Sequence, residues 1–98
     1  MKRRRPLYHV VLTNHSRKRW RYRVGRDAGN LGELLTMVLL EQLPAGLPVR
    51  RGFARLFLQK DKLDLSHDMW AFISLPNMRG EWIVLTFRPV TPAERRRF

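Results

Sequence analysis

The sequence predicts a single small α+β domain, in which one main helix packs on a mainly antiparallel sheet in the order β-β-α-β-β-β. Residues 31–43 have a broad apolar stripe at helical spacing. Five other segments are rich in β-forming residues and are bounded by turn residues. A chain of 98 residues is too short for two domains that each bury a core. We expect a flexible basic arm at 1–6, the folded domain at 7–89 and a basic tail at 90–98.

The first two strands are predicted at residues 7–13 and 19–24, joined by a polar loop. Residues 19–24 read Arg-Trp-Arg-Tyr-Arg-Val, a strict alternation that is typical of a strand with one buried face. Pairing the two strands as a hairpin places Trp20 and Tyr22 on the face toward the core. The same register places three arginines on the opposite face: Arg19, Arg21 and Arg23.

The main helix is predicted after this hairpin. Asn30 is a good N-cap, and Glu33 three residues later completes a capping-box pattern. Pro44 and Gly46 end the helix near Leu43, because proline cannot continue a helix and glycine favours its C-terminus.

Three further strands are predicted at residues 53–59, 69–75 and 81–88. A turn-rich segment at 76–80 joins the last two of them. Both of these strands carry apolar residues at odd and even positions. Such strands belong in the middle of a sheet with both faces covered, or at an interface.

The positive charge is concentrated at the start of the chain. The first 26 residues carry ten basic and no acidic side chains, whereas residues 27–94 carry seven basic and eight acidic ones. A basic pole on a nearly neutral body indicates a polyanionic partner, and nucleic acid is the one we favour.

The predicted hairpin gives this charge a geometry. Alternate residues of a strand lie roughly 7 Å apart, which is close to the spacing of phosphates along an extended nucleic-acid strand. Arginine presents a planar fork that binds phosphate bidentately. The predicted nucleic-acid contacts, to RNA or to DNA, are Arg3, Arg4, Arg5, His9, His15, Arg17, Lys18, Arg19, Arg21, Arg23 and Arg26.

Other interpretations of the same features remain open. The arginines could form a solvated face that resists edge-to-edge aggregation, or they could bind an acidic protein. Surplus apolar surface is predicted at four residues: Met37, Leu40, Trp82 and Val84. This surplus favours an interaction or inhibitor protein that binds a nucleic-acid-processing complex, such as a bacterial defence complex, and it would also suit a homodimer.

A noncatalytic role is favoured over an enzyme. The one enzyme class retained is a metal-free ribonuclease of the small toxin type, which needs a proton-transfer group and a cation beside the phosphate. Two combinations could supply them: His9 with Arg23, or His15 with Lys18 and Arg19. Ser66, His67 and Asp68 are consecutive, and we expect adjacent side chains of this kind to point in divergent directions and to form no triad.

Several classes are excluded by composition. The chain has no cysteine, so it has no disulfide and no thiolate metal site. Its three histidines are not spaced as metal ligands, and we expect no metal or cofactor. No apolar run approaches the roughly 20 residues that span a bilayer. We expect a cytoplasmic protein with no membrane partner.

Overall fold

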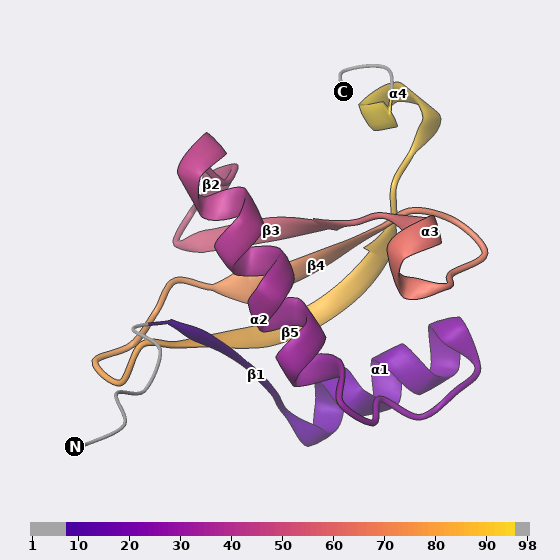
Figure 1. Ribbon diagram of the computed structural model, residues 1–98, viewed down its shortest axis with the longest axis horizontal. Coiled ribbons are helices and arrows are strands. Elements are labelled where there is room, and N and C mark those ends of the chain that lie inside the picture. Colours follow the sequence, from indigo (N-terminus) through magenta and orange to yellow (C-terminus); the bar gives the residue numbers. More distant parts are fainter. Residues whose placement is uncertain (1–7, 96–98) are drawn as a thin grey trace.

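The computed structural model describes residues 8–95, which form a five-stranded mixed sheet and four α-helices (Figure 1). The predicted α+β class is confirmed. The predicted arm, with Arg3, Arg4 and Arg5, lies outside the described residues. In chain order the elements are β1 (His9–Leu12), α1 (Asn14–Val24), α2 (Leu31–Gln42), the 3-10 helix η1 (Leu43–Ala45), β2 (Val49–Arg50), β3 (Phe53–Leu58), α3 (Lys60–Leu63), β4 (Met69–Ser74), β5 (Glu81–Pro89) and α4 (Pro92–Arg95).

The strands lie in the order β1-β5-β4-β3-β2. Strands β2 to β5 pair antiparallel with their neighbours, as predicted, whereas β1 pairs parallel to β5, with Val10 opposite Trp82. The predicted strands at 53–59, 69–75 and 81–88 match β3, β4 and β5 to within one residue at each end.

Helix α1 stands where the second strand was predicted, so the expected hairpin and the order β-β-α-β-β-β are wrong. A capping box starts the helix. The Thr13 hydroxyl accepts from the Ser16 N–H at 3.0 Å, and the Ser16 hydroxyl accepts from the Thr13 N–H at 2.8 Å. Gly25 ends the helix in the left-handed conformation, at φ 83°, and its N–H donates to the Arg21 carbonyl.

The buried face of α1 follows the helical period. Ser16, Trp20 and Val24 are four residues apart and turn toward the protein, whereas Tyr22 is 84% exposed. The predicted core position of Tyr22 is therefore wrong. Trp20 is 2% exposed, and its ring meets that of Phe87 edge to face, with the centroids 5.1 Å apart.

Helix α2 matches the prediction closely. Asn30 occupies the N-cap position, although its side chain makes no capping hydrogen bond. Leu31, Leu35 and Leu39 form one fully buried stripe. The α-helix ends at Gln42, and the chain continues for one turn as η1.

Two polar side chains of α2 join it to opposite edges of the sheet. The Thr36 hydroxyl accepts from the Val10 N–H on β1 at 2.9 Å and donates to the Gly32 carbonyl at 2.8 Å. The Gln42 side-chain amide accepts from the Phe57 N–H at 3.0 Å and donates to the Phe57 carbonyl at 2.8 Å, as a neighbouring strand would. The helix that covers the sheet thus satisfies the Val10 N–H at one edge and both backbone groups of Phe57 at the other.

Helices α1 and α2 pack on the same face of the sheet, which α2 crosses in Figure 1. The strand residues buried beneath them are Val10, Leu12, Ala54, Leu56, Leu58, Met69, Ala71, Ile73, Trp82, Val84 and Phe87. The expectation that Trp82 and Val84 supply surplus apolar surface is wrong, because both belong to this core. Met37 and Leu40 on α2 are exposed, at 60% and 48%.

A bulge in β5 decides which residues face the helices. Phe72 pairs with Thr86 and Ile73 with Val84, which leaves Leu85 as an extra residue. Val84 and Phe87 therefore both point into the core, and Thr86 and Arg88 point to the opposite face.

Within residues 8–95, no helix combines the length and the apolar character that crossing a membrane requires.

The different surroundings of Trp20 and Tyr22 can be tested by truncating each residue. We expect Trp20→Ala to lower the free energy of unfolding by about 3–5 kcal/mol, because it empties a large core position. Tyr22→Ala should change it by less than about 0.5 kcal/mol, as for most exposed sites. Urea unfolding followed by circular dichroism measures both. Equal losses in the two variants would contradict the helical assignment of this segment.

Candidate nucleic-acid interface

Helix α1 presents most of the basic residues that the sequence singled out. It carries five basic residues and no acidic one, and all its residues except Ser16, Trp20 and Val24 are exposed. We call the exposed side chains used below the basic helix surface: His15, Arg17, Lys18, Arg19, Arg21, Tyr22 and Arg23.

The charges surround the helix rather than forming a row. Residues two positions apart on a helix point in directions about 200° apart. Arg19 and Arg21 therefore lie on different sides, and the predicted line of strand arginines at regular spacing is wrong. Lys18 and Tyr22 are four residues apart and share the outermost strip, opposite Trp20.

The contacts made by these side chains leave their charge accessible. The Arg19 Nε donates to His15 Nε2 at 3.4 Å, one helical turn away. Arg21 Nε lies 3.4 Å from Asp27 Oδ1, and both side chains are largely exposed. An exposed pair of this kind contributes little energy, so a phosphate could replace Asp27 as the partner of Arg21.

Two predicted contacts lie apart from the basic helix surface. His9 stands on β1, with Nε2 3.7 Å from Glu81 Oε2. The Asn77 side chain is the main cause of a lowered pKa at Glu81, and the charges of Arg79 and His9 add to it. Arg26 follows α1, and its Nη1 donates to the Asp64 carbonyl at 2.8 Å, which ties the end of α1 to the connection between β3 and β4.

The ribonuclease combinations are only partly brought together. His9 begins β1 and Arg23 is near the end of α1, at opposite ends of this β-α unit (Figure 1). His15 and Arg19 do meet, but on an exposed helix face. In residues 8–95 no three His, Asp or Glu side chains are grouped so that they could hold a metal ion.

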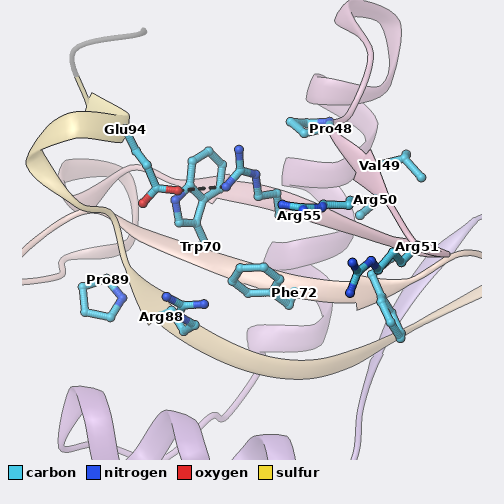
Figure 2. Close-up of a pocket in the computed structure, with 12 residues that line it drawn as sticks. Pro48, Val49, Arg50, Arg51, Arg55, Trp70, Phe72, Arg88, Pro89 and Glu94 are labelled. Carbon is cyan, nitrogen blue, oxygen red and sulfur yellow. Dashed lines mark hydrogen bonds and ion pairs between the residues drawn. The ribbon is translucent and has the colours of Figure 1, made fainter.

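A second basic surface lies on the face of the sheet opposite α2, where Figure 2 shows the strands in front of the helix. It is a hollow of about 590 Å³. Its walls include the turn between β2 and β3, and α4. We call this the sheet hollow and define it by Arg50, Arg51, Phe53, Arg55, Trp70, Phe72, Arg88 and Glu94.

Aromatic rings and arginines are paired across the strands of the sheet hollow. Residues that are directly opposite on neighbouring strands have Cβ atoms about 5 Å apart on one face. In each of three such pairs, one member is aromatic and the other is an arginine: Arg50 with Phe53, Arg55 with Phe72, and Trp70 with Arg88. The hollow thus alternates flat apolar surface with positive charge.

Helix α4 closes one end of the hollow. It lies in the predicted C-terminal tail and starts with a capping box, in which the Thr91 hydroxyl accepts from the Glu94 N–H at 3.2 Å. Glu94 Oε2 lies 2.9 Å from Arg55 Nη1, and the Arg55 guanidinium lies over the Trp70 ring, 4.2 Å from its centroid (Figure 2). A hydrogen bond from the Thr91 backbone is the main cause of a lowered pKa at Glu94, and the side chains of Thr91, Trp70 and Arg55 lower it further.

The sheet hollow was not predicted from the sequence, because basic and acidic residues were summed along the chain and not by their position in the fold. Residues 27–94 appeared neutral, yet four of their seven basic residues line the hollow. Of their eight acidic residues, Glu94 alone is among the lining residues, and it is paired with Arg55. The alternation Phe-Ala-Arg-Leu-Phe-Leu of β3 was a usable indication, since it sets an arginine between two rings on one face.

Comparison with known proteins gives no relative from which a function could be transferred. No model of a protein family matches the chain. Searches of curated proteins and of solved structures give no significant match. The function must therefore be inferred from the chain's own residues and their arrangement.

The contact between α4 and the sheet should depend on pH through Glu94. Because the pKa of Glu94 lies below its ordinary value of 4.5 in the folded protein, its carboxylate stabilises the fold fully above that pH. The stabilisation is lost as the pH falls through the lower, folded-state pKa. We expect Glu94→Gln to be less stable than the wild type near neutral pH, and the difference to shrink in acid. Urea unfolding across this pH range measures the difference.

Glu41→Gln is the matched control for this measurement. Glu41 Oε2 lies 3.3 Å from Lys62 Nζ in a pair that is exposed on both sides. Its removal should change stability little at any pH. A Glu94→Gln deficit that stays constant from neutral pH to strong acid would contradict the assigned role of the carboxylate.

Proposed function

We propose that this protein binds nucleic acid without catalysis, and that the basic helix surface is its main contact with the phosphate backbone. The supporting observation is the exposed helix α1, whose five cations have no acidic neighbour within the helix. A surface that only had to stay soluble would normally mix charges of both signs. A polyanion is the partner that such a surface binds best.

The geometry of α1 suits phosphate contacts better than it suits the reading of one base sequence. Its long cationic side chains spread around the exposed circumference, so they reach phosphates on both sides of a groove or along a curved strand. Tyr22 stands on the outermost strip, where it can donate a hydrogen bond or lie against a sugar or base. Both DNA and RNA fit this description.

A second candidate is an interaction protein or a homodimer, and Met37 and Leu40 favour it. Both side chains are exposed on α2, away from the sheet. The case is weaker than the sequence suggested, because Trp82 and Val84 are part of the core. A ribonuclease is less favoured, since His15 and Arg19 lie on an open helix surface that neither encloses a phosphate nor excludes water.

The proposal predicts a salt-dependent affinity that is reduced by neutralising α1. The test variant combines three substitutions: Lys18→Gln, Arg19→Gln and Arg21→Gln. Each lost phosphate contact should reduce the slope of log K against log salt by about one, so we expect a loss of about three for the triple variant. Fluorescence anisotropy with labelled duplex and single-stranded oligonucleotides over a salt series measures the slope.

A triple variant elsewhere on the surface provides the control, with Lys60→Gln, Lys62→Gln and Arg79→Gln. It removes the same formal charge but leaves α1 intact, so we expect nearly unchanged binding. Thermal unfolding should show that both variants remain folded, because five of the six substituted residues are exposed and Lys60 is only partly buried. Equal weakening by the two variants would reject α1 as the contact surface and leave only an effect of net charge.

A further inference from the structure

We infer that the sheet hollow is a second nucleic-acid contact, which stacks unpaired bases of a single strand while arginines at its rim hold the phosphates. This inference rests on the proposed function, since it takes nucleic acid as the ligand. It adds a distinct site, on the face of the sheet opposite α2, and a substrate class, the single strand. In a duplex the bases are stacked on one another, so only a single strand can present their flat faces to the protein.

The rings that would stack the bases are accessible. Phe53 is 46% exposed, and Phe72 is half-buried in the floor of the hollow. In the view of Figure 2, Phe72 lies between Arg88 and Arg51. The Arg88 guanidinium lies 5.6 Å from the centroid of the Phe72 ring. The volume of about 590 Å³ is within the range of sites that hold small organic groups.

Arg55 has a different role from the other arginines. Its charge is offset by Glu94, and its guanidinium is held over Trp70 by that ion pair. A guanidinium fixed in this way offers a flat, preorganised surface on which a base can stack. Within residues 8–95, Arg50, Arg51 and Arg88 form no ion pair with an acidic side chain, so they are the groups assigned to phosphate.

The backbone at Arg51 supports a role for its side chain. Arg51 and Gly52 form the two-residue turn between β2 and β3, with φ values of 54° and 80°. Both central residues of such a turn need positive φ, which favours Asn-Gly over Arg-Gly. An arginine is therefore present at a position where its backbone conformation is unfavourable, and its side chain lies at the rim of the hollow.

The ligand class follows from the combination of rings and charge. An acidic peptide would use the arginines but would leave Phe53 and Phe72 without a flat partner. A single strand uses both, because each nucleotide joins a flat base to a phosphate. Base–aromatic stacking contributes roughly 1–3 kcal/mol per base, which corresponds to a preference of at least about fivefold for each base stacked.

The decisive experiment compares an oligothymidylate with an abasic strand of equal length, so that the phosphates are the same and only the bases differ. We expect the wild type to bind the base-bearing strand at least about fivefold more tightly. The double variant Phe53→Leu with Phe72→Leu keeps apolar volume but removes the planar rings. It should lose the preference while binding the abasic strand as the wild type does.

Tyr8→Leu is the matched control, because it removes an exposed ring that lies outside both the sheet hollow and the basic helix surface, and it should keep the preference. Equal wild-type binding of the two strands would overturn the inference but leave the proposed function intact. No binding of either strand at low salt would overturn both. A preference that survives the double variant, or that disappears in Tyr8→Leu, would also overturn the inference. The inference would also be overturned if polyglutamate competed for the protein as effectively as oligothymidylate does.

Arg51→Asn gives a readout that a purely structural role would not produce. Asn suits the left-handed backbone conformation, so the variant should unfold at a higher urea concentration than the wild type. It should nevertheless bind oligothymidylate more weakly, because one phosphate contact is lost. A variant that is more stable and binds with undiminished affinity would contradict the assignment of Arg51 to the ligand.

Discussion

The hydrogen bonds that join α2 to both edges of the sheet decide which face of the sheet is covered by helices and which face is left to form the sheet hollow. Thr36 accepts a hydrogen bond from the Val10 N–H at the outer edge of β1, and Gln42 bonds both backbone groups of Phe57 at the edge of β3. A helix held at both points must lie across one face, and its leucine stripe buries that face. Strand alternation then directs the remaining side chains, including Phe53 and Arg55, to the opposite face. The sheet hollow exists because α1 and α2 share one side of the sheet.

The elements that local pattern could predict were α2 and four strands: β1, which lies within the strand predicted at 7–13, and the three antiparallel strands β3, β4 and β5. Helix α1 was misread because two periods coincide in it. Trp20 and Val24 are four residues apart, a spacing that keeps side chains on one face in a helix and in a strand alike. Only Tyr22 distinguishes the two, since it points inward in a strand and outward in a helix. The capping box at Thr13 and the glycine at position 25 were the available local evidence.

The amount of positive charge was predicted better than the position of the basic residues in the fold. Helix α1 carries five of the ten basic residues at the start of the chain, in a segment that the sequence did identify as basic. The sheet hollow was not predicted, because Arg88 is far in sequence from Arg50 and Arg55. The charge sum over residues 27–94 also balances these arginines against acidic residues that, except for Glu94, lie outside the hollow. Their grouping depends on strand order and on the bulge at Leu85, neither of which is encoded within a short segment. Pairing between strands that are distant in sequence decides where such a site forms, and a local sequence pattern cannot predict it.

The two basic surfaces differ in the physics they would contribute to binding. Charges on α1 act over about 10 Å at moderate salt, so they would govern encounter and the affinity for any polyanion. Stacking in the sheet hollow requires contact, acts on bases rather than phosphates, and is much less sensitive to salt. Under the proposal, raising the salt concentration would weaken the contribution of α1 first. The preference for a single strand should therefore become more pronounced as total affinity declines.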